Sequence, residues 1–266
     1  MTENIIHFYY HSGTGNTLLI VKEMTRIFID KGIHVKLYRI EDTNPNQIDP
    51  TTPLGLAFPV AFQSTFPFVW DFLNALPKAK GTPVFFVDTL MAFSGAIVGP
   101  LKKVLTEKGY DCIGSCEIVM PNNWLPKRIK TEENGEKIQK GLEKAKKYAE
   151  NLIEGNTTWK RIPFLSAGLY HLCCNKFIME KINLAEGRTI TIDRIKCVSC
   201  GLCAKLCPAN NITMYKYPEW NNSCQLCMRC LSFCPTNAVI IPGKTFQQYR
   251  AVKAGELTFE KNNVTV

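Results

Sequence analysis

Eight cysteines in the last third of the chain form two matching runs that could ligate iron–sulfur clusters. Each run follows the pattern Cys-x2-Cys-x2-Cys-x3-Cys-Pro, and every cysteine of the second run lies 27 residues after its counterpart in the first. A [4Fe-4S] cluster needs four thiolates, of which a short run supplies three while the fourth comes from elsewhere. The spacing therefore predicts two [4Fe-4S] clusters.

The ligands of the two clusters are expected to cross between the runs. In the bacterial two-cluster pattern, the fourth cysteine of each run ligates the other cluster. Cluster I is then expected on Cys197, Cys200, Cys203 and Cys234. Cluster II is expected on Cys207, Cys224, Cys227 and Cys230. Crossed ligation would tie both runs into one unit, and the proline after each crossing cysteine suits a chain that turns away from the cluster.

Zinc and disulfides are the alternatives for these cysteines. A zinc ribbon needs two Cys-x2-Cys pairs, not two quartets that each continue to a third cysteine and to a fourth followed by proline. A disulfide framework fits less well, because the chain starts at Met1 and enters an apolar run by Ile5 without the basic region or cleavage site of a secreted protein. A cytoplasmic location, where thiols stay reduced, is therefore expected.

The bulk composition is that of a globular chain. Its 266 residues are 45% hydrophobic and 21% charged, which allows one substantial core and a smaller unit. No membrane span is expected, since the nearest candidate, residues 162–179, is interrupted by His171, Asn175 and Lys176. The formal net charge of +9 counts every cysteine as neutral. Two clusters of about −2 each lower it, so the charge is no argument for a nucleic-acid partner.

The first part of the chain predicts a doubly wound α/β sheet. Short apolar runs alternate with amphipathic stretches from residue 4 to about 155, as in parallel strands joined by helices. Five strands are expected at Ile5–Tyr10, Val35–Ile40, Leu54–Val60, Pro83–Asp88 and Cys112–Met120. A helix is expected at Asn16–Asp30. Residues 127–150 predict a solvated closing helix, with a docking face for an acidic partner as the alternative.

Three parts of the chain are distinguished by these patterns. Residues 1–155 are expected to form the sheet domain, residues 156–187 a helical connector, and residues 188–266 a small α+β domain with the cysteine runs and a C-terminal tail. Short strands are expected at residues 188–193, 212–215 and 238–241. A small unit of this kind has little apolar core, and its clusters act as staples instead.

A possible phosphate-binding loop joins the first strand to the first helix: Ser12-Gly13-Thr14-Gly15-Asn16-Thr17. Backbone N–H groups, hydroxyls and a helix N-terminus there suit a phosphate, and glycine permits close approach. The loop lacks the Gly-Lys-Ser/Thr ending of a Walker loop and is not G-x-G-x-x-G. Its hydroxyl content fits a terminal monophosphate better than a triphosphate.

This loop resembles the FMN phosphate loop of flavodoxins, Ser/Thr-x-Thr-Gly-Asn-Thr. Together with the cysteine runs, it makes nearly the whole chain similar to the bacterial and archaeal flavodoxin–ferredoxin fusion proteins. Residues 121–124, Pro-Asn-Asn-Trp, and Trp220 are also typical of that family. The resemblance implies a flavodoxin-like fold, with a five-stranded parallel sheet of order 2-1-3-4-5 and FMN at its carboxyl edge.

The resemblance also implies residues that contact the isoalloxazine ring of the flavin. Loops at three expected strand ends carry aromatic and small residues, and those assigned to flavin contact are Phe62, Phe93, Ser94, Gly95, Asn123 and Trp124. Ordinary packing is the alternative for any single aromatic residue. His11, where these fusions commonly have an aromatic or apolar residue, is interpreted as a strand-end histidine with partners, and tuning of the flavin is the alternative.

The remaining cysteines fit neither quartet. Cys112 and Cys116 are expected on one face of a strand, in the core. Cys173 and Cys174 are adjacent in an expected helix, where side chains point about 100° apart, which disfavours joint ligation. No Ser-His-Asp order, carboxylate pair or HExxH motif supports hydrolytic chemistry.

These features predict an electron-transfer protein with FMN and two low-potential [4Fe-4S] clusters, which links a ferredoxin-type carrier to a redox partner protein. Joining the centres in one chain raises their effective concentration for each other. Two alternatives remain: an FMN-dependent reductase of a small organic substrate, fed by its own clusters, and a redox or iron sensor that binds a partner protein. The direction of electron flow stays open, and so does a homodimer that brings one chain's clusters to the other's flavin.

Overall fold

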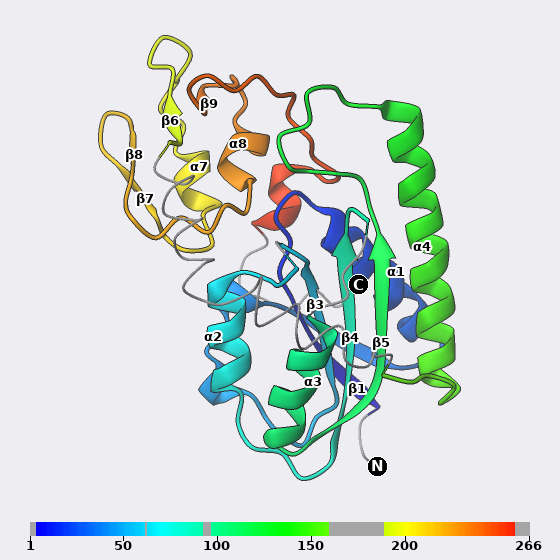
Figure 1. The fold of residues 1–266 in the computed structure, drawn as a ribbon. Helices are drawn as coiled ribbons and strands as arrows, with labels where there is room; N and C mark the ends of the chain where they lie inside the picture. Colours follow the sequence, from blue (N-terminus) through cyan, green and yellow to red (C-terminus); the bar gives the residue numbers. More distant parts are fainter. Residues whose placement is uncertain (1–3, 62, 93–96, 160–188, 259–266) are drawn as a thin grey trace.

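The larger domain is a five-stranded parallel sheet in the order β2-β1-β3-β4-β5 (Figure 1). The computed structural model describes residues 4–61, 63–92, 97–159 and 189–258. The strands are β1 (Ile5–Tyr10), β2 (His34–Arg39), β3 (Leu54–Pro59), β4 (Thr82–Leu90) and β5 (Tyr110–Val119). Two 3-10 turns join β2 to β3: η1 (Ile40–Asp42) and η2 (Pro45–Gln47). The flavodoxin-like order 2-1-3-4-5 is thus confirmed, with every strand within two residues of its predicted bounds.

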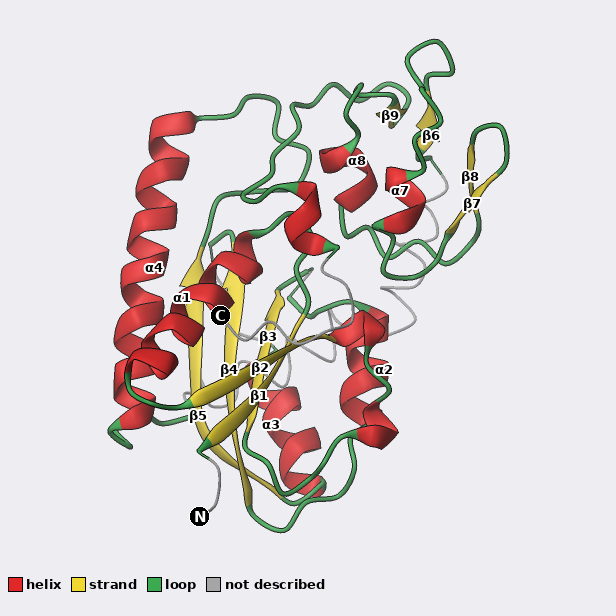
Figure 2. Ribbon diagram, turned by 180° about the vertical axis from the view of Figure 1, so that it is seen from behind, coloured by secondary structure: helices red, strands yellow, loops and turns green. Residues whose placement is uncertain are grey.

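Helices cover both faces of the sheet (Figure 2). α1 (Asn16–Asp30) and α4 (Thr131–Ile153) pack on one face, and α2 (Pro67–Ala75) and α3 (Val98–Glu107) pack on the other. The helix α1 has one apolar side, because its buried residues recur every three or four positions. They include Leu18, Val21, Met24 and Phe28.

The helix α4 is the one predicted within residues 127–150. Its buried residues are Gly141, Ala145, Tyr148 and Ala149, which lie on one side. The remaining surface is charged and carries pairs one turn apart, such as Lys137 with Glu133 at 2.8 Å. The interpretation as a solvated closing helix is confirmed, and a docking role for its charged face stays untested.

A bulge in β5 separates the two cysteines of that strand. Cys112 pairs with Val84, whereas the next partner, Phe85, pairs with Gly114, so that one extra residue is inserted. Cys112 therefore packs on the α2–α3 side of the sheet and Cys116 on the α1–α4 side. The prediction that they share one face is wrong, because regular alternation holds only where no residue is inserted. Both thiols are partly buried.

A smaller unit follows at the carboxyl end of the sheet (Figure 1). Its strands form two antiparallel pairs, β6 with β9 and β7 with β8. The elements are β6 (Thr191–Ile192), α7 (Leu202–Lys205), β7 (Ile212–Met214), β8 (Pro218–Trp220), α8 (Arg229–Phe233) and β9 (Val239–Ile240). Six buried apolar side chains form its small core. Each predicted short strand contains one of the observed strands, and β8 was not predicted.

The two halves of this unit repeat each other in backbone conformation as well as in sequence. Residues with positive φ occur in pairs that are again 27 positions apart: Ser199 and Leu226, Gly201 and Met228, Asn210 and Asn237. Helices α7 and α8 begin at the same offset. Left-handed backbone is costly for residues other than glycine. Its recurrence at equivalent positions therefore indicates that both cysteine runs require the same local conformation.

The chain then returns to the sheet domain. Residues 249–258, which we call the C-terminal strap, include the 3-10 turn η3 (Ala254–Leu257). Val252 and Leu257 of the strap are buried in the same core cluster as α1 and α4. The Tyr249 hydroxyl donates to Asn16 Oδ1 at 2.6 Å, and the Ala251 N–H donates to the carbonyl of Thr14 at 2.8 Å. The strap thus supports the loop that precedes α1.

Several predicted features lie outside the described residues. They include Cys173, Cys174 and almost all of the connector over 156–187. Among the helices that are described, none has the length and apolar character needed to cross a membrane.

Candidate functional site

The proposed phosphate loop is buried where β1 ends and α1 begins. Ser12, Thr14 and Thr17 are each at most 1% exposed. Gly15 immediately precedes α1 with φ of +106°, a left-handed conformation that favours glycine. The helix begins without a side-chain cap from Gly15. Its N-terminus is therefore suited to an anion.

Side chains from other strand ends hold this loop in place. The Asn123 Nδ2 donates to Thr14 Oγ1 at 3.0 Å, and Asn16 Nδ2 donates to the carbonyl of Pro121 at 2.9 Å. The hydroxyls of Thr17 and Thr89 are 2.8 Å apart. The loops after β1, β4 and β5 thus meet at the carboxyl edge of the sheet, where doubly wound sheets bind ligands.

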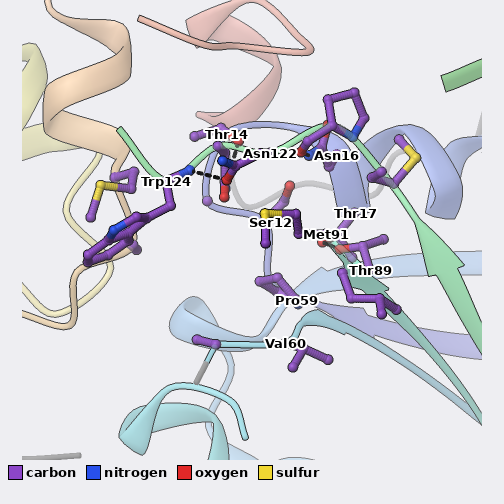
Figure 3. A pocket seen from close by; sticks show the side chains of 18 of the residues that line it. Ser12, Thr14, Asn16, Thr17, Pro59, Val60, Thr89, Met91, Asn122 and Trp124 are labelled. Carbon is purple, nitrogen blue, oxygen red and sulfur yellow. Dashed lines mark hydrogen bonds between the residues drawn. The ribbon is translucent and has the colours of Figure 1, made fainter. Parts of the chain in front are cut away.

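A cavity of about 340 Å³ opens at this edge (Figure 3). It is lined by the proposed phosphate loop apart from Gly15, by residues after β3, β4 and β5, and by residues 226–228 of the smaller unit. Asn123 and Trp124, two of the predicted flavin contacts, line it. The other four, Phe62, Phe93, Ser94 and Gly95, lie outside the described residues.

Sequence reasoning missed one wall of the cavity, formed by Leu226, Cys227 and Met228. These residues belong to the second cysteine run, and nothing local in the sequence indicates that this run faces the phosphate loop. Trp124 packs between the two parts, against the core of the smaller unit. The approach is close, since a Cβ atom built on Gly13 would lie 2.4 Å from the carbonyl oxygen of Cys227.

The eight cysteines of the two runs line two separate hollows. One hollow is lined by Cys197, Cys200, Cys203 and Cys234. The other is lined by Cys207, Cys224, Cys227 and Cys230, and Trp220 closes one side of it. Each hollow thus combines three cysteines of one run with the fourth of the other, which is the grouping that crossed ligation requires.

The grouping of these thiols can be compared with what a zinc ion and what a [4Fe-4S] cluster would require. Within the described ranges, no three His, Cys, Asp or Glu side chains are grouped so as to hold a single metal ion. A tetrahedral zinc ion draws four sulfurs to about 2.3 Å from one centre. The thiolates of a [4Fe-4S] cluster bind four different irons, and each quartet of cysteines lines a hollow of its own.

Backbone N–H groups point at the two crossing cysteines. Asn211 N donates to Cys207 Sγ at 3.3 Å, and Ala238 N donates to Cys234 Sγ at 3.2 Å. These bonds are again 27 positions apart, and they stabilise negative charge on sulfur. Burial raises the pKa of Cys203 to about 11 and that of Cys227 to about 12, so these two thiols are less favoured as bare anions. The iron of a bound cluster would supply the positive charge that such thiolates need.

A buried polar cluster lies beside the phosphate loop. His11 Nδ1 is 2.9 Å from Glu41 Oε2, and the guanidinium of Arg229 donates to Glu41 Oε1 at 2.5 Å. Burial lowers the pKa of His11. Burial also opposes the ionisation of Glu41, but Arg229 and His11 outweigh it and hold the pKa of Glu41 well below its usual range. His11 thus has one partnered nitrogen, whereas its Nε2 has no hydrogen-bond partner within the described structure.

Known proteins are similar to two parts of the chain. The family of 4Fe-4S binding domains matches residues 190–213. An uncharacterised ferredoxin of Methanocaldococcus jannaschii is 36% identical over 58 residues, which cover 20% of this chain and 75% of that protein.

Solved flavodoxins resemble the first part of the chain. The two-electron reduced flavodoxin of Megasphaera elsdenii is 26% identical and covers 53% of this chain and 98% of its own, with a TM-score of 0.40. A flavodoxin of Streptococcus pneumoniae TIGR4 is 16% identical and covers 56% of this chain and 98% of its own, with a TM-score of 0.41.

The strand order and the ferredoxin relative together define the class. The chain belongs to the ferredoxins through its C-terminal unit, and it joins that unit to a domain with the flavodoxin-like fold. It thus has the architecture of a flavodoxin–ferredoxin fusion.

Proposed function

We propose that the chain holds one FMN in the cavity beside the phosphate loop and two [4Fe-4S] clusters in the two cysteine-lined hollows, and that it carries electrons between them. When bound, FMN exchanges electrons singly or in pairs, and a cluster exchanges them one at a time. The protein's part is to hold these centres at fixed positions and to set the charge around them.

The residues of the cavity fit a flavin mononucleotide. Ser12, Thr14 and Thr17 supply hydroxyls, and the N-terminus of α1 supplies backbone N–H groups for a phosphate. The cavity volume of about 340 Å³ is in the range of small-molecule sites. Trp124 and Asn123 are proposed to contact the isoalloxazine ring, because they line the same cavity. Phe62, Phe93, Ser94 and Gly95 remain proposed contacts on the resemblance alone.

The two cysteine quartets are proposed as the cluster ligands. Cluster I would be held by Cys197, Cys200, Cys203 and Cys234. Cluster II would be held by Cys207, Cys224, Cys227 and Cys230. The repeated backbone conformation and the N–H bonds to the crossing sulfurs support equivalent roles for the two quartets.

One observation carries the proposal of internal electron transfer. Leu226, Cys227 and Met228 line both the flavin cavity and the hollow of cluster II. A single three-residue segment therefore separates the two cofactor sites within one chain. This arrangement favours transfer within the chain over the head-to-tail dimer, because a second copy is not needed to bring a cluster to the flavin.

Cluster I is proposed to exchange electrons with an external ferredoxin-type carrier. Its ligand Cys200 is exposed, whereas the seven other ligands are partly buried. Val198 and Ile195, close by in the sequence, are 63% and 97% exposed. Electrons would pass between the carrier and cluster I, then cluster II, then the flavin, in the direction set by the potentials of the carrier and of a second partner.

The proposed domain boundaries follow the sequence, with one addition. Residues 1–155 form the flavodoxin-like domain, 156–187 the connector, and 188–266 the ferredoxin domain with its tail. The C-terminal strap at 249–258, however, packs on the first domain. A cytoplasmic location remains our proposal, because the cluster ligands must stay reduced.

The test is the content of iron, sulfide and acid-released flavin in protein purified under strict anaerobic conditions. We expect about eight iron atoms and one FMN per chain. About four iron atoms would contradict the second cluster. Eight iron atoms without flavin, even after reconstitution, would contradict internal transfer and favour the sensor alternative.

A second measurement separates the carrier from the reductase. A reduced ferredoxin should bleach the flavin absorbance of the anaerobic protein without any organic substrate. Repeated reoxidation of the flavin by one small organic compound, and by no electron-carrier protein, would favour the reductase instead.

A further inference from the structure

Arg229 is the largest fully buried side chain among the described residues, with 1% of its surface exposed. It begins α8 and lies between two proposed ligands of cluster II, Cys227 and Cys230. The equivalent position in the first run, 27 residues earlier, is Leu202. The duplicated unit is therefore symmetric in its cysteines and backbone, but asymmetric in this one buried charge.

The guanidinium of Arg229 joins three parts of the molecule. Its Nε donates to the carbonyl of Ser12 in the phosphate loop at 3.0 Å. One terminal nitrogen donates at 3.1 Å to the carbonyl of Leu206, the residue before the crossing ligand Cys207. The other donates to Glu41 at 2.5 Å. An arginine in this position therefore fixes the ligand run of cluster II against the flavin site.

The charges around Arg229 are unevenly placed with respect to cluster II. Arg229 extends from the ligand run itself, whereas Glu41 lies in η1 of the sheet domain and accepts a hydrogen bond from one terminal nitrogen of the guanidinium. His11 adds no charge while it is neutral, and Arg39 pairs with Asp42 beside it. Of this ion pair, the positive charge is thus the one carried by the ligand run of cluster II.

The buried charge of Arg229 affects how readily cluster II takes up an electron. A cluster becomes more negative by one charge when it is reduced, and net charge near a cluster sets its potential. Interactions between charges are stronger in a buried site than in water. An arginine keeps its charge at every working pH. A permanent cation beside the ligands therefore stabilises the reduced state of cluster II more than a leucine would.

We propose that Arg229 is a potential-setting residue: its buried charge raises the reduction potential of cluster II, and makes the flavin-side cluster electronically distinct from cluster I. This inference rests on the proposed function, since it requires that Cys207, Cys224, Cys227 and Cys230 hold a cluster. The hydrogen bonds of Arg229 position the ligand run, and its charge tunes the centre that the run holds.

The test is a redox titration of cluster II followed by electron paramagnetic resonance. It is made in the Cys200→Ala background, which removes or converts cluster I and leaves the cluster II signal to be followed. Arg229→Leu, which copies the first run, should lower the potential of cluster II. We expect the reduction equilibrium to weaken at least tenfold, or about 59 mV for one electron. Glu41→Gln, which removes the countercharge, should shift the potential in the opposite direction.

Opposite shifts in the potential of cluster II distinguish an effect of charge from an effect of packing. A merely structural role of Arg229 would shift the potential of Arg229→Leu and of Glu41→Gln in the same direction. Arg250→Leu is the matched control, because Arg250 is exposed and its charge is screened. Arg229→Lys keeps the charge and should retain most of the potential. Arg229→Leu could fail to fold because it leaves Glu41 unpaired. In that case the double variant Arg229→Leu with Glu41→Gln is titrated instead, and we again expect a lowered potential of cluster II.

Equal or absent shifts in the two single variants, or an unchanged potential in the double variant, would overturn the role of Arg229. A failure of the proposed function gives a different experimental result from a failure of this inference. A chain without the iron of two clusters before any substitution would overturn both proposals, whereas full iron and flavin content with unchanged potentials overturns this one alone.

Discussion

Thr14 joins the proposed phosphate loop to two other segments through single hydrogen bonds. Its hydroxyl accepts a hydrogen bond from Asn123 of the loop after β5, and its carbonyl accepts one from Ala251 of the C-terminal strap. The side chain is 1% exposed and lines the cavity. A substitution here therefore reports on the proposed phosphate site itself, and not on solvent-exposed surface.

Thr14→Asp should expel FMN. The new carboxylate would lie against the phosphate, and juxtaposed like charges in a buried site cost several kcal/mol. We expect the affinity for FMN to fall by a factor of about 100 or more, measured by fluorescence quenching when FMN is added to flavin-free protein. Thr14→Ser keeps the hydroxyl and is the control. Unchanged affinity in Thr14→Asp would mean that this loop does not bind the phosphate.

Cys200→Ala should remove or convert one cluster and leave the flavin bound. Cys200 lines the hollow of cluster I but not the flavin cavity. Iron analysis should show a loss of between about one and four iron atoms, depending on whether the cluster is converted or lost. The ratio of FMN to protein should stay the same. Simultaneous loss of all flavin would show that the two modules are not separable.

At the level of elements, the regular parts of the fold were predictable and the irregular ones were not. The ends of β1 and α1 were predicted to the residue, because an apolar run, a glycine-containing turn and a helical period follow one another without ambiguity. The bulge in β5 was missed, since an inserted residue changes which face a side chain occupies without changing the composition of the strand. Local sequence carries no signal for it.

The candidate site shows the same contrast between local and non-local information. The phosphate loop and the cysteine quartets were recognised because their residues are close in sequence. The contact of residues 226–228 with the phosphate loop joins segments about 200 positions apart, and the contact of Arg229 with Glu41 joins segments 188 positions apart. Such contacts follow from tertiary packing, which a single sequence does not reveal.

Gly13→Ala tests the contact between the phosphate loop and the second cysteine run. The added Cβ would lie 2.4 Å from the carbonyl oxygen of Cys227, so the two loops must separate. We expect weaker FMN binding and a lower midpoint of thermal unfolding. Gly135→Ala in α4 is the control, since a Cβ there meets nothing within 4 Å and alanine stabilises a helix by about 0.5–1 kcal/mol. A Gly13→Ala variant with unchanged FMN affinity would show that the loops adjust without cost.

On the scale of the whole molecule, the ferredoxin unit is built into the sheet domain. Leu206 and Phe233 of that unit belong to the same buried core cluster as α1 and α4. Arg229 adds a buried polar link, and the strap returns the chain to the sheet domain. The two units are therefore fixed with respect to each other by packing among the described residues.

Electron transfer between the clusters and the flavin should consequently be independent of protein concentration. The rate constant can be followed by stopped-flow absorbance after the clusters are reduced, over a roughly hundredfold range of protein concentration. An intramolecular step gives a constant rate, whereas transfer between chains of a dimer in equilibrium rises with concentration. A rising rate would favour the head-to-tail homodimer.

The C-terminal strap has a consequence for the biogenesis of the protein. During translation the strap leaves the ribosome after both cysteine runs, so the nascent chain presents its cluster ligands while Thr14 still lacks its bond from Ala251 and Gly15 still lacks its cover from Val252. The proposed phosphate loop therefore gains these supporting contacts from a segment that follows both cysteine runs. For the cofactors proposed above, we expect that iron–sulfur assembly can begin on the growing chain before the phosphate loop has the support of the strap.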